Sequence, residues 1–421
     1  MKSISFALPN GLELGGVTVW SLNLSRSLGA LGHPVHILEH VTERSVHGDA
    51  ADATDISRLP VHGAPFALNR DEMRRFAETY RRVLPGVIVP NYSTGTYATC
   101  ANLSRVQSHA MRVIGFAHTD EEEYYEHLRF YAPIIHRFVA VSEEIRQRLA
   151  ERIPQRADDI VVRPYGIHVP TGLTHGYSTP GAPLRLTYAG RLVEKQKRVS
   201  DLIRLVDILT ARGVDFVLTI AGEGEEAPAF DRLLRSPSTA ARVEMVGRLA
   251  HREMEALWRR SDVCVLTSAY EGCSISMLEA MASGCIPVVT AVSGTSRFIR
   301  SGENGYTVPV GDMMGMADAI EALARDRARL PRLGRAAHDA VAATCEYGEY
   351  VRWFERTAKS LWREPAREWP RYRPLFRPTL QEMLTRGSRY VRHNHPILFN
   401  LYEQANYHVH RVLNRLPEGV K

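Results

Sequence analysis

The stretch of sequence that decides the fold is residues 263–290, VCVLTSAYEGCSISMLEAMASGCIPVVT. It opens with an apolar run, residues 263–267, that is typical of a buried strand, and residues 275–283 follow with helical spacing. Gly284 suits the end of a helix, and residues 286–290 form a second apolar run. A strand, a helix and a strand in this order form a βαβ unit, which predicts a parallel sheet.

Apolar runs alternate with helical patterns on both sides of this unit. We expect strands at residues 4–8, 35–38, 87–89, 112–117, 138–141, 184–189, 216–221, 243–246, 263–267 and 286–290, and helices at 17–31, 313–325 and 332–344. Residues 169–183 are rich in Gly and Pro and are the best linker candidate. The expected class is α/β, with two doubly wound, Rossmann-like parallel-sheet domains facing a central cleft.

Composition excludes several classes of protein. The chain has 421 residues, 44% of them apolar and 24% charged, which is ordinary for a globular protein of two or three domains. Residues 361–421 contain 11 Lys and Arg and 5 Asp and Glu, so they carry the whole net charge of +6 and the body is neutral. A nucleic-acid partner is therefore not expected. Five scattered cysteines favour a reducing cytosol, and neither a membrane span nor a signal peptide is expected.

A second prediction concerns the loop and helix start inside the opening stretch. Gly272 lets a ligand approach the backbone, and the N–H groups of Ser274–Ser276 would face the cleft at a helix N-terminus. This arrangement is typical of a phosphate site. Glu271 and Glu279 flank it, and both can point into one pocket, where carboxylates would accept hydrogen bonds from sugar hydroxyls. The plainer alternative is that both are solvated acids favoured by the helix dipole.

Three further loops follow predicted strands. Arg191 and Lys197 occupy one strand-to-helix loop and can converge on an anion such as a departing diphosphate. Gly15 and Gly16 lie in the first strand-to-helix turn, which is neither G-x-G-x-x-G nor a P-loop, so nicotinamide and ATPase chemistry are not supported. His118 ends the strand at 112–117. Ordinary surface charges, a turn glycine and a structural histidine are the plainer alternatives.

These residues resemble a known family, the retaining glycosyltransferases of family 4, which have the GT-B fold and use nucleotide sugars. The resemblance covers residues 4 to about 361. Its most specific part is Glu271-x7-Glu279 followed by Gly284, and the second is Gly190-Arg191-Leu192 with Gln196-Lys197. One departure is Tyr165, which precedes Gly166 where members usually carry Asn. We expect this departure to affect that linker turn and not the donor site.

The resemblance implies a division of labour. Residues 1–170 would bind the acceptor and 183–345 the nucleotide sugar, 346–362 would cross back to the first domain, and 363–421 would be a basic, aromatic extension. Arg191 and Lys197 would hold the diphosphate, while Glu271 and His118 would contact the donor sugar. The remaining donor contacts would come from Gly15, Gly16, Val246, Gly247, Gly272, Cys273, Ser274, Ile275 and, at the ribose, Glu279. No protein base, cofactor or metal is expected, because the leaving phosphate oxygen would take the acceptor proton.

The acceptor and the cellular site are less defined. A UDP- or GDP-sugar donor and a glycan or lipid-linked acceptor both fit, in polysaccharide or glycolipid synthesis. The helix at 69–84 carries an arginine face, and residues 396–415 form an amphipathic helix pattern. For each of these segments two interpretations remain: it packs on the first domain, or it touches an anionic acceptor or membrane surface. The protein would then be cytoplasmic and peripheral on the membrane. A nucleotide-sugar epimerase and an inactive partner-binding subunit remain the alternatives.

Overall fold

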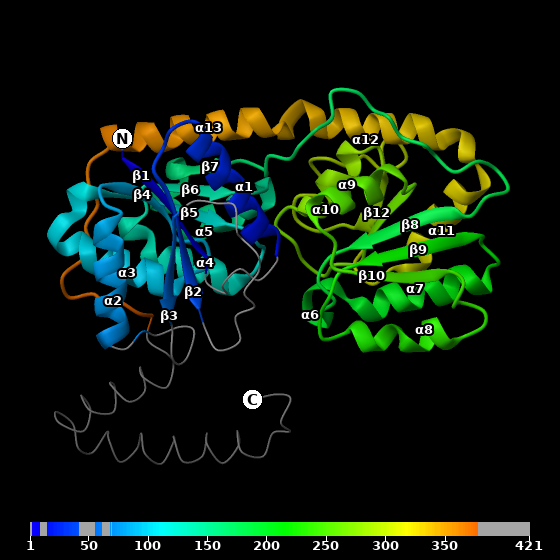
Figure 1. The fold of residues 1–421 in the computed structure, drawn as a ribbon, viewed down its shortest axis with the longest axis horizontal. Helices are drawn as coiled ribbons and strands as arrows, with labels where there is room; N and C mark the ends of the chain where they lie inside the picture. Colours follow the sequence, from blue (N-terminus) through cyan, green and yellow to red (C-terminus); the bar gives the residue numbers. More distant parts are fainter. Residues whose placement is uncertain (1, 9–14, 42–54, 61–67, 69, 378–421) are drawn as a thin grey trace, which may run out of the picture. The chain divides into compact units, whose positions relative to one another are not determined.

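The computed structural model describes residues 2–8, 15–41, 55–60, 68 and 70–377. The chain divides into two compact units, Met1–Arg371 and Tyr372–Lys421. The second unit lies almost wholly outside the described residues, and so does the helix expected at 396–415. Figure 1 shows that the first unit contains two sheets, each covered by helices. We call residues up to 170 the first half and residues 184–345 the second half.

The first half is a parallel sheet of seven strands in the order β3-β2-β1-β4-β5-β6-β7. Its elements, in chain order, are β1 (Ser3–Leu8), α1 (Gly16–Ala30), β2 (Val35–Val41), β3 (Asp55–Pro60), α2 (Arg70–Arg82), β4 (Gly86–Val89), α3 (Thr94–Gln107), β5 (Met111–Ala117), α4 (Glu122–Tyr131), β6 (Arg137–Ala140), α5 (Glu143–Arg152) and β7 (Ile160–Val162). β1 to β3 are wound toward one edge of the sheet and β4 to β7 toward the other, with β4 placed beside β1, as in a doubly wound fold.

The second half is a parallel sheet of six strands in the order β10-β9-β8-β11-β12-β13. Its elements are β8 (Leu184–Ala189), α6 (Glu194–Lys197), α7 (Val199–Ala211), β9 (Phe216–Ala221), α8 (Asp231–Arg235), β10 (Val243–Gly247), α9 (His251–Arg259), β11 (Val263–Leu266), α10 (Ile275–Ala282), β12 (Ile286–Thr290), β13 (Tyr306–Val308), α11 (Met313–Arg325) and α12 (Leu330–Cys345). The predicted fold class is confirmed.

Strand order places one switch point in each sheet. It falls between β1 and β4 in the first sheet and between β8 and β11 in the second, because the winding direction reverses there. Loops at a switch point diverge and leave room for a ligand beyond the carboxyl ends of the strands. The loops that carry Arg191 and Glu271 follow β8 and β11. They therefore lie at the switch point of the second sheet.

Sequence patterns missed three strands, β3, β7 and β13. All three lie at sheet edges. β7 and β13 have three residues each, and β3 reads DISRLP, which has no continuous apolar run. An edge strand is covered on fewer sides than a central one, so its sequence needs fewer apolar residues. The hydrophobic signal is accordingly weakest where these strands occur.

The linker candidate is bound to the second half by hydrogen bonds. Residues 169–183 form no helix or strand, yet they are tied to the second half. The Tyr177 hydroxyl donates to the Gly284 carbonyl at 2.9 Å, and the Ser178 N–H donates to Asp262 Oδ1 at 2.9 Å. His175 Nδ1 lies 2.7 Å from the Ser283 carbonyl. Polar groups of the linker that water would otherwise satisfy are thus bound to protein.

A long helix near the end of the described chain, α13 (Tyr347–Ser360), packs on the first half. Trp20 Nε1 donates to the Tyr350 hydroxyl at 3.1 Å, and the rings of Phe6 and Phe354 stack with their centres 5.7 Å apart. These contacts hold α13 against the first half. No helix among the described residues is both long and apolar enough to cross a membrane.

The segment after α13 also docks on the first half. Trp369 is 1% exposed and packs against Phe130 and Tyr131, and its backbone N–H donates to Ser104 Oγ at 2.9 Å. The Arg112 guanidinium donates to the carbonyls of Leu361 and Glu364 at 2.9 Å each. The beginning of the extension is therefore part of the first unit, which ends at Arg371.

Candidate active site

The loops that follow β8 and β11 are joined by hydrogen bonds. The Ala269 N–H donates to the Gln196 carbonyl at 2.8 Å. The Thr267 hydroxyl donates to the Lys197 carbonyl at 2.8 Å. These bonds fix the short helix α6, and with it the start of the Lys197 side chain, against the loop that carries Glu271.

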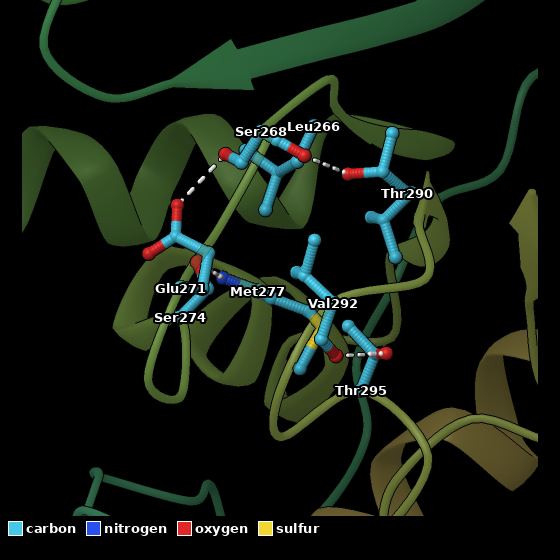
Figure 2. Close-up of a pocket in the computed structure, with 9 residues that line it drawn as sticks. Leu266, Ser268, Glu271, Ser274, Met277, Thr290, Val292 and Thr295 are labelled. Carbon is cyan, nitrogen blue, oxygen red and sulfur yellow. Dashed lines mark hydrogen bonds between the residues drawn. The ribbon is translucent and has the colours of Figure 1, made fainter. Parts of the chain in front are cut away.

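Lys197 and Glu271 form the central ion pair of this site. Lys197 Nζ donates to Glu271 Oε1 at 2.5 Å, and both side chains are only 11% exposed. Ser268 Oγ donates to the same carboxylate oxygen at 2.7 Å, and Figure 2 shows the two side chains turned toward each other. The charge of each group is thus compensated where burial would otherwise make it costly.

Arg191, by contrast, is exposed. Its Nη2 donates to Gln196 Oε1 at 2.9 Å, so a neutral amide holds the guanidinium. A Cβ added at Gly190 would lie 3.5 Å from Lys197 Cε, which places the lysine stem against the residue before Arg191. The two cations therefore border the same loop, although only Lys197 is buried.

The N-terminus of α10 lies next to this pair. Ser274 is its N-cap, and Ser274 Oγ accepts from the Met277 N–H at 3.4 Å. The N–H groups of Ile275 and Ser276 belong to the first turn, where an α-helix supplies no internal partner. A Cβ at Gly16 would lie 3.2 Å from Ile275 Cδ1, so the first half reaches this helix start.

Gly272 and Cys273 precede the helix and have different roles in packing. A Cβ at Gly272 would lie 2.0 Å from the His118 carbonyl oxygen, so only glycine fits between the two halves there. Cys273 is buried, and burial raises the pKa of its thiol well above the usual value. The thiol is therefore protonated, and Cys273 acts as a small packing residue.

A small pocket lies behind Glu271, between the ends of β11 and β12 and the start of α10. Figure 2 shows it, and its lining residues are Leu266, Ser268, Glu271, Ser274, Met277, Val289, Thr290, Val292 and Thr295. Glu279 does not line this pocket. Burial raises the pKa of Glu279 to about 7, and the Trp258 side chain opposes that shift. The two glutamates thus occupy different environments, and the structure does not bring them into this one pocket.

Glycines hold the loops after β8, β9 and β10 close together. The Gly222 N–H donates to the Gly247 carbonyl at 2.8 Å, and a Cβ at Gly222 would lie 1.9 Å from the Gly190 carbonyl oxygen. Gly247 has φ +64°, a left-handed conformation that favours glycine. Val246 is the residue before it in β10. These three loops form a continuous backbone surface at the carboxyl edge of the sheet.

His118, at the end of β5, is buried with both ring nitrogens bonded. Its Nδ1 lies 2.6 Å from the Tyr165 hydroxyl, and its Nε2 lies 3.0 Å from Asn91 Oδ1. Burial lowers the pKa of His118 to about 3, so the imidazole is neutral. The imidazole stacks on Phe116 and Tyr165, with interplanar angles of 9° and 5°.

Sequence reasoning missed Asn91, Tyr165 and Ser268. Asn91 lies two residues after the end of β4, at the switch point of the first sheet, and that position was a signal that could have found it. Tyr165 belongs to the predicted linker turn, and its hydroxyl also lies 2.6 Å from Nδ1 of His118, the histidine that the resemblance assigns to the donor sugar.

Side chains from the two halves also meet directly. Ser293 Oγ donates to Asp120. Glu144 accepts from the Gly294 N–H at 3.2 Å and from Ser296 Oγ at 2.5 Å. The loop after β12 is thus held by carboxylates of the first half, which brings the carboxyl edges of the two sheets together.

Two doubly wound parallel sheets that meet at their carboxyl edges define the GT-B class of proteins. The family described as "Glycosyltransferase Family 4" matches residues 14–169, and the one described as "Glycosyl transferases group 1" matches residues 183–326. Together they span both halves. The chain belongs to the glycosyltransferases of the family 4 type.

Known proteins agree with this assignment. Glycogen synthase of Mycobacterium tuberculosis is 32% identical over 39% of this chain and 40% of its own length. Phosphatidyl-myo-inositol mannosyltransferase of Mycobacterium leprae is 29% identical over 48% of this chain and 54% of its own length. The matches thus span about half or less of these relatives. The crystal structure of Anabaena HepE in complex with UDP-glucose has the same fold, with a TM-score of 0.70 and 14% identity over 86% of this chain and 100% of that one.

Proposed function

We propose that this protein transfers a sugar from a nucleotide diphosphate sugar, UDP- or GDP-linked, to a glycan or lipid-linked acceptor, with retention of the anomeric configuration. The observation that carries the proposal is the buried pair of Lys197 and Glu271 at the switch point of the second sheet. It puts a cation for phosphate and a carboxylate for hydroxyls side by side. Phosphate joined to a hydroxyl-rich ring is the chemistry of a nucleotide sugar.

In this proposal the second half binds the donor. Lys197 and Arg191 neutralise the charge that grows on the departing diphosphate, and each well-placed donor contributes about 3 kcal/mol to the transition state. The first-turn N–H groups of α10 add a favourable dipole for the phosphates. Glu271 accepts hydrogen bonds from donor-sugar hydroxyls, and Glu279 accepts from the ribose.

Retention follows if the acceptor attacks on the face from which the diphosphate leaves. The leaving phosphate oxygen then takes the acceptor proton, so no side chain has to act as a base. The state of the nearby groups supports this route: the neutral His118 has both ring nitrogens bonded, and Cys273 is a thiol. We propose that Arg191 and Lys197 neutralise the negative charge on the departing diphosphate, and that no divalent metal is required.

The acceptor would bind to the first half. The exposed side chains of α2 include Arg74, Arg75, Arg81 and Arg82. Such a basic face suits an anionic acceptor or the anionic membrane that carries one. The relatives named above, which include a glycogen synthase and a mannosyltransferase of phosphatidyl-myo-inositol, support polysaccharide or glycolipid synthesis as the setting.

The test is to incubate the full chain with a panel of UDP- and GDP-sugars, with and without candidate acceptors, and to measure nucleotide release and the product's anomeric configuration. We expect release that depends on one donor and rises with acceptor, also in excess chelator. A donor converted to its epimer without nucleotide release would contradict transfer. So would the absence of binding to every nucleotide sugar.

A further inference from the structure

His118 is surrounded by groups that leave it one arrangement of protons. The Asn91 amide is fixed first, because Asn91 Nδ2 donates to the Ala7 carbonyl at 2.8 Å and to Ser21 Oγ at 3.2 Å. A carbonyl oxygen only accepts, so the amide nitrogen must face Ala7. The amide oxygen then faces His118 Nε2 at 3.0 Å.

Only one tautomer of the His118 imidazole fits these partners. An amide oxygen cannot donate, so His118 Nε2 must carry the proton in this contact. A neutral imidazole has one N–H, which leaves Nδ1 as the acceptor. The Tyr165 hydroxyl, 2.6 Å away, must then be the donor to Nδ1. Burial raises the pKa of Tyr165 well above its usual value, so the tyrosine keeps the proton that it donates.

The two partners are themselves held firmly. Asn91 is 2% exposed and has φ +50°, a left-handed conformation that asparagine tolerates and most residues do not. Tyr165 is 3% exposed, and the next residue, Gly166, packs so closely on α13 that a Cβ there would lie 2.3 Å from Tyr350 Cβ. The position of Tyr165 is therefore fixed by the returning helix.

We propose that Asn91 and Tyr165 are positioning residues that lock His118 in the neutral tautomer protonated on Nε2. His118 then cannot act as a base, because Nδ1 accepts from the Tyr165 hydroxyl and Nε2 carries the proton that it donates to Asn91. The functional part of this inference rests on the proposed function, whereas the tautomer does not.

The test uses the full chain labelled with ¹⁵N and long-range ¹H–¹⁵N correlation of the histidine rings, with no donor or acceptor present. His118→Gln identifies the resonances by their loss. We expect a protonated, pyrrole-like Nε2 and an unprotonated, pyridine-like Nδ1 in the unmodified protein between pH 6 and pH 8. A protonated Nδ1, or a ring that titrates in this range, overturns the proposal without any variant.

Tyr165→Phe keeps the stacked ring and removes only the hydroxyl. We expect the preference for the Nε2–H tautomer to fall by roughly fivefold to tenfold, the size expected for one net hydrogen bond. The catalytic efficiency toward the donor should fall by a similar factor. Tyr350→Phe is the matched control, because its hydroxyl accepts from Trp20 and does not contact His118. It should leave the tautomer unchanged.

The outcomes separate the two proposals. Unchanged histidine spectra in Tyr165→Phe overturn the tautomer lock, whatever the activity of the enzyme. The expected spectra in a protein that transfers no sugar would leave the lock standing and contradict only the proposed function. Asn91→Gly keeps the left-handed backbone and removes the acceptor for Nε2–H. It should lower the preference for the Nε2–H tautomer, and an unchanged preference would also count against the proposal.

Discussion

Lys197 Nζ and Glu271 Oε1 lie 2.5 Å apart, and neither side chain is more than 11% exposed. The residues are 74 positions apart in the sequence. The pair joins the loops after β8 and β11, so it is a structural link as well as a proposed donor site. Removing either partner leaves the other as a buried charge, which costs more than the pair itself contributes.

The first prediction is that this pair is strongly coupled. Lys197→Met or Glu271→Gln alone should lower the free energy of unfolding, by about 3 kcal/mol for the lysine variant, because a buried carboxylate then keeps only its neutral partner. The double variant should lose less than the sum of the two. Urea unfolding measures all three. The exposed pair Arg235–Asp231 is the control, and Arg235→Met should leave stability nearly unchanged.

Arg191 gives a prediction about turnover alone. The side chain is exposed, so Arg191→Ala should leave the melting temperature unchanged. Turnover should fall roughly 10²-fold, because a donor to the leaving diphosphate is lost. Binding of free nucleotide should weaken less than turnover falls. Lys195→Ala, which removes an exposed lysine 3.7 Å from Glu121, is the control and should keep near-normal turnover. Equal turnover in both variants would reject the role of Arg191.

Glu279 should make the protein's stability depend on pH. Its folded-state pKa of about 7 lies above the usual 4.5, so the folded protein binds the proton more tightly than the unfolded chain does. The free energy of unfolding should therefore decline as the pH rises from about 5 to about 7. Glu279→Gln carries no charge at any pH and should remove this decline. Unfolding curves for both proteins at several pH values give the comparison.

The same group should affect donor affinity in the opposite direction. A carboxylate accepts from ribose hydroxyls better than a carboxylic acid does, so nucleotide affinity should increase as the pH rises through about 7. Titration calorimetry with the free nucleotide measures this dependence. Affinity that follows the same pH profile in Glu279→Gln would assign the effect to another group.

Glu144 connects the halves and should matter for closure. Glu144→Ala removes the acceptor for Ser296 Oγ and the Gly294 N–H, so catalytic efficiency should fall about tenfold. Ser296→Ala should cost less, and the double variant should be no worse than Glu144→Ala alone, because both remove one contact. Glu143→Ala, at the exposed neighbouring position, is the control. Additive losses would show that Glu144 acts elsewhere.

Variants at Trp369 and Tyr372 should distinguish the docked beginning of the basic extension, up to Arg371, from the residues that follow it. Trp369→Ala should cost about 3–5 kcal/mol, because the ring is 1% exposed in an aromatic cluster. Tyr372→Ala, at a fully exposed position, should cost nothing measurable. A chain that ends at Arg371 should keep its melting temperature, whereas one that ends at Arg363 should lose much of it. Vesicle sedimentation of full-length and shortened chains then tests membrane binding.

The parts of the fold that could be predicted are those with local signals. β8, β9, β12 and α11 have the expected bounds, because continuous apolar runs and helical spacing mark them. The edge strand β3 could not be found, because its pairing with β2 is decided by the neighbouring strand and not by its own sequence. The pattern of apolar residues in a sequence reflects burial, and edge strands are the least buried strands of a sheet, so this pattern is weakest for them.

In the candidate site, too, only the features with a local sequence signal could be predicted. Arg191, Lys197 and Glu271 could be placed at strand ends, since each follows a predicted strand closely. The ion pair between them could not be predicted. The sequence suggested that Arg191 and Lys197 converge on an anion, whereas the structure pairs Lys197 with Glu271. The contact of Tyr165 with His118 spans 47 residues and depends on how the returning helix packs, and no local pattern reports that.

The return of α13 also has a consequence for synthesis on the ribosome. The first half is translated first, yet its core includes Tyr350, Phe354 and Trp369 from much later in the chain. The second half needs only residues 184–345 for its own sheet. Domains usually fold in the order in which they are made. In this protein the apolar face of the earlier-made half stays uncovered until residues 347–369 have emerged, so we expect the nascent chain to depend most on chaperones before that point.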